Sequence, residues 1–144
     1  MTLKVVILCG GSGSRFGDSV YPKPMNLIRG VPMIYHVLDS LACDHVTFIY
    51  NRALESVGFR QYVVNTFKAK TFDFIRVDFQ TRGPAETLLI GLKSLYGDDQ
   101  LLVLDNDNVY DGLDFTDLPS GNFVLYNKNP TGLSHYSFVQ TDDH

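Results

Sequence analysis

Three glycines and two basic residues near the start of the chain have the spacing of a polyphosphate-binding turn. Gly10, Gly11 and Gly13 directly follow an apolar run, and Arg15 and Lys23 come shortly afterwards. Glycine lets the backbone approach a ligand closely, and successive backbone N–H groups can then point at anionic oxygens. The two cations would neutralise charge that develops as a phosphoryl group is displaced. The segment therefore predicts a nucleotide-binding site at which a nucleotidyl group is transferred.

Two common phosphate-binding motifs fit these glycines poorly. A P-loop requires G-x-x-x-x-G-K-[ST], and Gly10 does not begin that pattern. The dinucleotide fingerprint G-x-G-x-x-G must open a helix. Here Gly11 and Gly13 are followed by Gly17, one place late, and then by a segment rich in proline. We therefore expect a loop over residues 10–31.

Two carboxylates follow a second apolar run, Leu101–Leu104, in the order Asp105-Asn106-Asp107-Asn108. In an extended chain Asp105 and Asp107 point to the same side. Mg²⁺ is a hard ion that binds carboxylate and substrate phosphate oxygens. We expect these two residues to hold Mg²⁺, and the alternative is a polar turn or a helix cap.

Hydrophobic periodicity predicts the elements that position these residues. Strands are expected at 3–9, 45–50, 71–79, 101–104, 122–127 and 135–141, and helices from near Pro32, over 53–67 and from Pro84. Strands that alternate with helices predict an α/β fold, a Rossmann-like three-layer α/β/α sandwich with a mostly parallel sheet. Ligands bind beyond the carboxyl ends of such strands. The glycine turn and the acidic pair follow the first and fourth strands, so we expect them to share one site.

The helix that begins at Pro84 has the clearest pattern in the chain. Proline suits a first helical turn, and Glu86 suits the positive end of the helix dipole. Its apolar residues at helical spacing are expected to face the sheet: Ala85, Leu88, Leu89, Leu92 and Leu95.

Composition narrows the class of protein. The 144 residues are 44% hydrophobic and 19% charged, as expected for a single soluble domain. The net charge of −4 argues against a non-specific nucleic-acid binder, which needs a basic face. No apolar stretch approaches the length of a membrane span. Cys9 and Cys43 are expected to be free thiols, which favours a cytoplasmic setting.

The segments Gly10-Gly11-Ser12-Gly13-Ser14-Arg15 and Pro22-Lys23-Pro24 resemble the signature loop of the sugar-phosphate nucleotidyltransferases, G-G-x-G-x-R followed by P-K-P. The resemblance implies that Arg15 and Lys23 are catalytic and hold the triphosphate and the attacking phosphate. It also implies that nucleotide-binding residues include Cys9, Gly10, Gly11, Ser12 and Gly13.

Two further segments resemble the same family. Residues 80–87 are similar to its base-recognition segment, which implies nucleotide contacts from Gln80, Gly83, Ala85 and Glu86. A glutamine offers a donor and an acceptor to a base edge. The family's metal-binding aspartate corresponds to Asp107, with Asn106 where a glycine is usual. Residues 135–139 resemble a strand near the sugar, with Ser137 at another glycine position.

The resemblance runs from about residue 3 to residue 141, whereas members of the family are considerably longer. We therefore expect residues 1–144 to be the nucleotide-binding part of a truncated nucleotidyltransferase domain, without the acceptor-binding part. The implied reaction joins NMP from an NTP to a phosphorylated small-molecule acceptor, foremost a sugar 1-phosphate, and releases pyrophosphate. Mg²⁺ is the implied cofactor, and self-association into a homo-oligomer is left open. A metal-dependent glycosyltransferase and a non-catalytic nucleotide-binding module are the alternatives.

Overall fold

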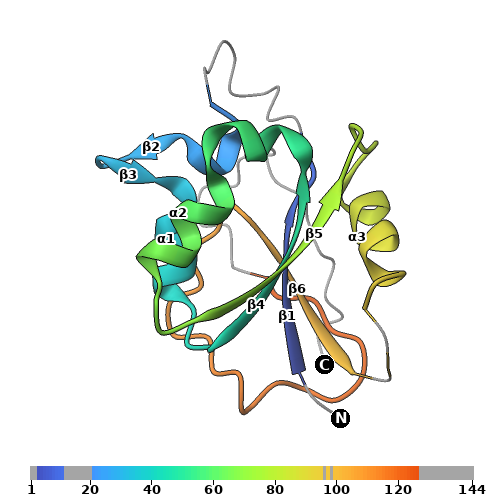
Figure 1. Ribbon diagram of the computed structural model, residues 1–144. Helices are drawn as coiled ribbons and strands as arrows, with labels where there is room; N and C mark the ends of the chain where they lie inside the picture. Colours follow the sequence, from blue (N-terminus) through green and yellow to red (C-terminus); the bar gives the residue numbers. More distant parts are fainter. Residues whose placement is uncertain (1–2, 12–20, 96, 98, 127–144) are drawn as a thin grey trace, which may run out of the picture.

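A four-stranded parallel sheet forms the centre of the molecule, in a computed structural model that describes residues 3–11, 21–95, 97 and 99–126. The strands are β1 (Leu3–Cys9), β4 (His45–Asn51), β5 (Thr71–Val77) and β6 (Gln100–Asp105). Their spatial order is β5-β4-β1-β6, so the first strand lies between the second and the fourth in sequence. All carboxyl ends lie at one edge of the sheet, at the top of Figure 1.

Helices cover both faces of this sheet. Helices α1 (Met33–Ser40) and α2 (Phe59–Thr66) lie on one face, and α3 (Pro84–Leu92) lies on the other (Figure 1). The three-layer α/β/α prediction is therefore confirmed. Within the described residues, every helix is too short or too polar to cross a bilayer.

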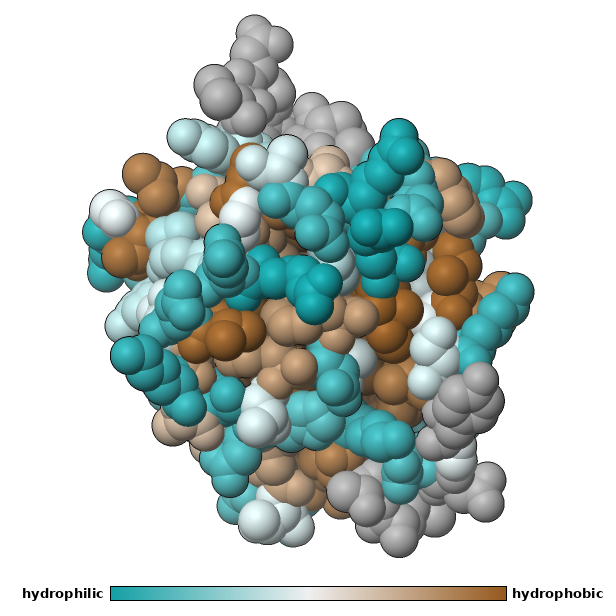
Figure 2. Space-filling view, in the orientation of Figure 1, coloured by the Kyte–Doolittle hydropathy of each residue, from teal (hydrophilic) through white to brown (hydrophobic). Residues whose placement is uncertain are grey.

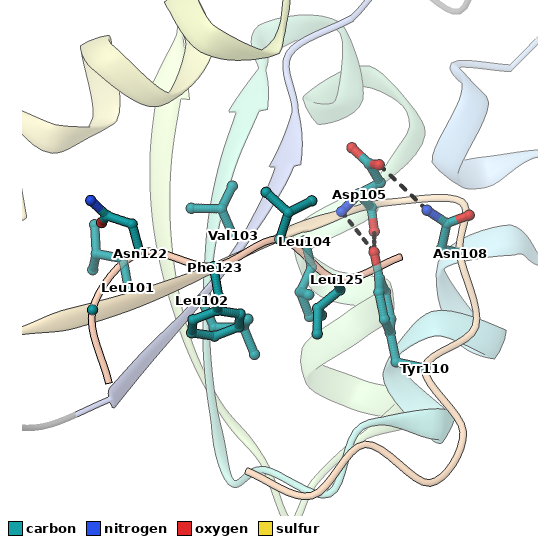
Figure 3. Close-up of a pocket in the computed structure, with 12 residues that line it drawn as sticks. Leu101, Leu102, Val103, Leu104, Asp105, Asn108, Tyr110, Asn122, Phe123 and Leu125 are labelled. Carbon is teal, nitrogen blue, oxygen red and sulfur yellow. Dashed lines mark hydrogen bonds between the residues drawn. The ribbon is translucent and has the colours of Figure 1, made fainter. Parts of the chain in front are cut away.

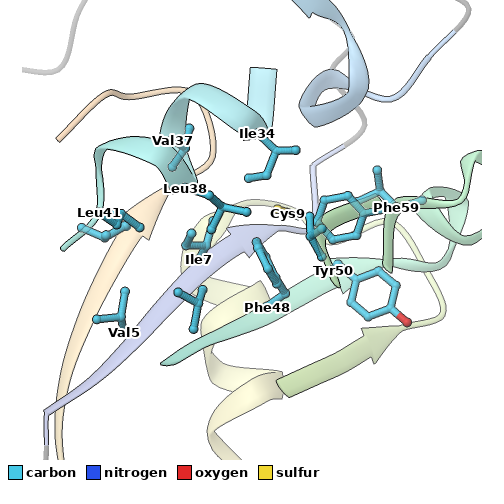
Figure 4. Packing of buried hydrophobic residues seen from close by; sticks show 14 of the residues in the cluster. Val5, Ile7, Cys9, Ile34, Val37, Leu38, Leu41, Phe48, Tyr50 and Phe59 are labelled. Atoms are coloured by element: carbon cyan, nitrogen blue, oxygen red, sulfur yellow. The ribbon is translucent and has the colours of Figure 1, made fainter. Parts of the chain in front are cut away.

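Alternating side chains of β1 fill two separate cores. Val5 and Ile7 pack with α1 and α2 in the larger cluster, which contains the ring pair Phe48 and Phe59 at a centroid distance of 5.1 Å (Figure 4). Val6 and Leu8 face the opposite way and pack against α3. A strand that is buried on both faces has apolar residues at successive positions rather than at alternate ones. The apolar run at residues 3–9 predicted this strand, and the prediction is confirmed.

The predicted loop at 10–31 contains short regular structure near its end. A 3-10 turn, η2 (Lys23–Met25), precedes a hairpin of β2 (Leu27–Ile28) and β3 (Val31–Pro32). The two residues between these strands, Arg29 and Gly30, both have positive φ, as a tight two-residue hairpin loop requires. Pro32 caps α1, so the helix begins near Pro32 as predicted.

Residues 53–67 do not form one helix. A 3-10 segment, η3 (Arg52–Val57), ends at Gly58, whose φ of 69° is left-handed, and α2 begins at the next residue. Glycine adopts this conformation without a Cβ clash, so the chain changes direction there. The third strand also ends earlier than predicted, at Val77 rather than at Phe79.

The predicted buried stripe of α3 is wrong for Ala85, Leu89 and Leu92, whereas Leu88 and Leu95 pack against the core that contains Val6 and Leu8, as predicted. Thr87 and Gly91 are the buried positions, whereas Ala85, Leu89 and Leu92 are exposed and Leu88 and Leu95 are half-buried. Leu89 is 61% exposed, and Figure 2 shows hydrophobic side chains on the surface at the side where α3 lies. The reason is close packing: a Cβ built on Gly91 would overlap Ile49, so the helix approaches β4 through its smallest residue.

The predicted strand at 122–127 is not observed over its described residues. Residues 122–126 have extended or irregular backbone without ladder pairing, and Val124 and Tyr126 are exposed. Phe123 nevertheless packs against the larger core. Alternating apolar residues predict a half-buried surface, but a strand also needs a pairing partner. The strand predicted at 135–141 lies outside the described residues.

Candidate functional site

The residues that follow β1 and β6 meet at the carboxyl edge of the sheet. Leu8 of β1 is paired in register with Asp105 of β6. The glycine turn after β1 therefore lies beside residues 105–107, which we call the acidic tip. The Asn106 side chain bridges them, because its Nδ2 donates a hydrogen bond of 2.5 Å to the Leu8 carbonyl. Parallel pairing thus places the two predicted halves of the site together.

Lys23 and Asp107 form an ion pair at this edge. The Lys23 Nζ atom donates to Asp107 Oδ2 at 2.5 Å, across a sequence separation of 84 residues. Lys23 begins η2, directly after Pro22, and this turn packs against α1. Both side chains are partly exposed, at 26% and 35%, so a ligand can reach the pair. The basic segment and the acidic tip therefore lie side by side at this edge of the sheet.

Gly10 brings the start of α3 to the same place. A Cβ on Gly10 would lie 2.7 Å from Thr87 Cγ2 and closer still to Thr87 Oγ1. The Thr87 hydroxyl is buried, lies 2.7 Å from the Thr81 hydroxyl and donates to the Gly83 carbonyl. Helix α3 can therefore pack against the end of β1 only when residue 10 has no side chain.

The other predicted nucleotide contacts surround the start of α3. Gln80 and Ala85 are exposed, and Gly83 is half-buried at the N-cap. The Gln80 Nε2 atom donates to the Thr81 carbonyl at 3.2 Å. Glu86 accepts from the Arg82 backbone N–H at 2.6 Å and pairs with the Arg82 guanidinium at 3.0 Å. Glu86 thus holds the turn that precedes the helix.

Acid should loosen this turn. The Arg82 backbone N–H and then its side chain lower the pKa of Glu86, so Glu86 stabilises the fold above its unfolded pKa of about 4.3. That contribution is lost as pH falls through the lower, folded pKa. We expect Glu86→Gln to lower the melting temperature at pH 7, with a difference from the parent that shrinks toward pH 3. Melting curves at several pH values measure it, and a difference that grows in acid would contradict it.

The acidic tip is electrostatically crowded. Burial, followed by the neighbouring Asp107, raises the pKa of Asp105, while Lys23 acts in the opposite direction. Burial also raises the pKa of the Cys9 thiol, which remains protonated and is part of the larger core. Cys9 is therefore no nucleophile, and any contribution to ligand binding comes from its backbone.

Two neighbouring carboxylates at a strand end fit Mg²⁺. Their mutual repulsion is relieved by a divalent cation, and Mg²⁺ is commonly bound through one or two carboxylates with water and substrate phosphates. Within the described ranges, no three His, Cys, Asp or Glu side chains converge, so the protein offers no all-protein metal cage there. Asp105 and Asp107 are the residues that would hold the ion.

Asn106 has an orientation that its partner dictates. The Leu8 carbonyl can only accept, so Nδ2 must face it, and the Asn106 Oδ1 atom is then buried without a hydrogen-bond partner among the described residues. We expect Asn106→Ala to lower the free energy of unfolding by about 1–2 kcal/mol, because one buried hydrogen bond is lost.

Asn106→Asp is the sharper variant, because it has the same shape but no donor. It places a carboxylate against the Leu8 carbonyl and beside two other acidic residues, so at pH 7 it should destabilise the fold more than alanine does. Urea denaturation of both variants measures the order. An aspartate variant as stable as the parent would show that the bridge to Leu8 is unimportant.

Sequence reasoning missed two residues that shape the site. Thr87 sets the distance between α3 and Gly10, and a threonine in a first helical turn carries no distinguishing signal. The Tyr110 hydroxyl accepts from the Asp105 backbone N–H at 2.9 Å (Figure 3). The Tyr110 N–H donates to Ser40 Oγ at 2.9 Å. Tyr110 therefore anchors the acidic tip to the end of α1.

A hollow of about 400 Å³ lies between residues 101–105 of β6 and residues 121–125 (Figure 3). Asp105 and Asn108 are among the residues that line it, whereas Gly10 and Gly11, the described residues of the glycine turn, are not. Ser12, Gly13 and Arg15, which were predicted for the site, lie outside the described residues. Gly11 is at the margin of the described chain and is exposed.

Comparison with protein families gives one match, the MobA-like NTP transferase domain, over residues 5–112. The chain belongs to this family. The match begins within β1 and ends after β6, and thus includes all the described residues of the candidate site. A search of curated protein sequences finds no match.

Solved structures agree with this assignment to the NTP transferase domain. A nucleoside-diphosphate-sugar pyrophosphorylase from Vibrio cholerae RC9 is 25% identical with a TM-score of 0.63, over 78% of this chain and 51% of that one. A putative glucose-1-phosphate thymidylyltransferase from Bacillus anthracis is 25% identical with a TM-score of 0.59, over 75% and 45%. HddC from Yersinia pseudotuberculosis, complexed with GMP-PN, shares the fold at 24% identity and a TM-score of 0.59, over 74% and 48%.

This NTP transferase domain therefore spans about half the length of the solved structures it matches. The family to which the chain belongs is one of NTP transferases, as its description states.

Proposed function

We propose that this domain transfers a nucleotidyl group from an NTP to a phosphorylated small molecule, a sugar 1-phosphate, with release of pyrophosphate. The observation that supports it is the contact between Lys23 and Asp107 at the carboxyl edge of the sheet. A cation for phosphate and a carboxylate for a divalent ion lie side by side, next to the glycine turn that begins at Gly10. Residues 1–144 supply the nucleotide-binding part of the enzyme in this proposal.

The proposed chemistry needs positioning and charge more than proton transfer. A phosphate oxygen of the acceptor attacks the α-phosphorus in line, one P–O bond forms, and the bond to the β,γ-pyrophosphate breaks. That oxygen is already ionised near neutral pH, so no general base is required. The backbone N–H groups of the glycine turn orient the triphosphate, and Lys23 and Arg15 bind oxygens on which charge accumulates.

Asp105 and Asp107 would hold the metal. Mg²⁺, when bound there, would neutralise charge on the triphosphate and on the departing pyrophosphate. Gln80 and Gly83 lie in the segment that leads into α3, with Gly83 at its N-cap, and we assign them to the base. Because Cys9 and Cys43 are free thiols, we assign the enzyme to the cytoplasm.

A pyrophosphate-release assay on the complete protein tests this proposal. Each of the common NTPs is first screened by thermal shift with Mg²⁺, and the NTP that stabilises the protein is then combined with a panel of sugar 1-phosphates. We expect pyrophosphate that depends on one acceptor class and equals the nucleotide-sugar formed. Omission of Mg²⁺ is the control and should abolish the product.

The alternatives give different products. A glycosyltransferase would release a nucleoside diphosphate from a nucleotide-sugar and no pyrophosphate. A binding module would show NTP binding by calorimetry without any turnover. Either result, in the presence of the full acceptor panel, would contradict nucleotidyl transfer.

A further inference from the structure

The ion pair that identifies the site also blocks it. In the proposed reaction Lys23 binds phosphate and Asp107 binds a divalent cation, yet here Lys23 Nζ lies 2.5 Å from Asp107 Oδ2. The Lys23 ammonium group takes the place of the cation that Asp107 would bind, and the Asp107 carboxylate takes the place of the phosphate that Lys23 would bind. The ammonium group therefore stands where a cation coordinated by Asp107 Oδ2 would lie, at about 2.1 Å for Mg²⁺.

A divalent cation and Lys23 cannot both contact Asp107 Oδ2. Like charges repel at such distances, and the ammonium must move before the metal binds. A triphosphate offers Lys23 several anionic oxygens and thus a place to move to. Asp107 is then free for the metal, and the neighbouring Asp105 adds a second carboxylate.

We propose that Lys23 is a latch on the metal site: it neutralises Asp107 while the site is empty and is drawn away by the triphosphate. This inference rests on the proposed function, because the NTP is the ligand that opens the latch. Its consequence is an order of binding. The metal binds weakly to the empty protein, and it binds well once the nucleotide has engaged Lys23.

A second ion pair supplies the matched control. Lys4 Nζ lies 2.8 Å from Asp99 Oδ2 at the opposite edge of the sheet, and this pair also joins the β1 side to the β6 side. Its side chains are 29% and 26% exposed, close to the values for Lys23 and Asp107. It differs in lying far along both strands from the glycine turn and the acidic tip. A general effect of removing one positive charge would therefore appear at both pairs.

The experiment measures metal binding without nucleotide. Mn²⁺ alone is titrated into the complete protein and the free ion is measured by electron paramagnetic resonance. We expect Lys23→Gln to bind Mn²⁺ about two- to fivefold more tightly than the parent, because breaking an exposed ion pair releases the carboxylate. Lys23→Arg keeps the charge and should bind as weakly as the parent, and Lys4→Gln should also leave the affinity unchanged.

A further variant locates the gained affinity. Combining Lys23→Gln with Asp107→Asn should abolish the tighter binding, because the carboxylate that was released is absent. The latch is overturned if Lys23→Gln leaves Mn²⁺ affinity unchanged or weakens it, or if Lys4→Gln gives the same gain. Pyrophosphate release by the parent protein, together with unchanged Mn²⁺ affinity in Lys23→Gln, would remove the latch and retain the proposed function. Tighter Mn²⁺ binding by Lys23→Gln, with no pyrophosphate release by the parent protein, would do the reverse.

Discussion

Lys23→Ala is expected to lower the rate of pyrophosphate release about 10²- to 10³-fold, the usual effect of removing one group that stabilises transition-state charge. The loss arises because an anionic phosphate oxygen loses its cation in a partly enclosed site. Folding stability should change by no more than about 1 kcal/mol, because the pair of Lys23 with Asp107 is exposed and screened. Steady-state kinetics and urea denaturation of the same preparation separate the two quantities.

Lys4→Ala is the control for this variant. It removes an ion pair of similar length and exposure, which also joins the β1 side of the sheet to the β6 side. This pair lies at the edge of the sheet that is remote from the glycine turn. We expect a comparable small change in stability and an unchanged rate. If Lys23→Ala retained the parent's turnover, Lys23 would have no part in the mechanism.

Gly10→Ala is expected to destabilise the fold by about 2–3 kcal/mol, within the range for overpacking of a tight contact. The new methyl group would overlap the Thr87 side chain, which cannot turn away easily. Thr87 is β-branched and buried, and its hydroxyl is held by Thr81 and by the Gly83 carbonyl. Helix α3 would have to shift, and its displacement would also move the segment assigned to the base.

The neighbouring glycine and a second-site change test this explanation. A Cβ on Gly11 meets no described atom within 4 Å, so Gly11→Ala should leave stability within about 0.5 kcal/mol of the parent. Thr87→Ala removes the overlapping atoms, so the double variant Gly10→Ala with Thr87→Ala should be more stable than the sum of the single effects. Additive losses would show that the contact with Thr87 is not the cause.

The sequence alone was sufficient to predict the four strands of the described sheet and the edge at which the segments after β1 and β6 lie. Residues 3–9 and 101–104 are continuous apolar runs, and such runs predict strands buried on both faces. Strand β1 is buried in this way, whereas Val103 of β6 is 36% exposed. Parallel strands present all their carboxyl ends at one edge, so the residues after them were expected to meet there. The glycine turn and the Asp105–Asp107 tip each consist of residues that are close together in sequence, so each motif can be recognised from the sequence alone.

Only the tertiary structure decided which face of α3 is buried and which side chains join the two halves of the site. Helical periodicity counts apolar residues, but close packing against Ile49 of β4 selects Gly91, and close packing against Gly10 after β1 selects Thr87. The contacts of Asn106 with Leu8 and of Lys23 with Asp107 join residues 98 and 84 positions apart. Hydrophobic patterning specifies how each segment folds locally, whereas contacts of this range depend on strand order and register, which arise when the whole sheet assembles.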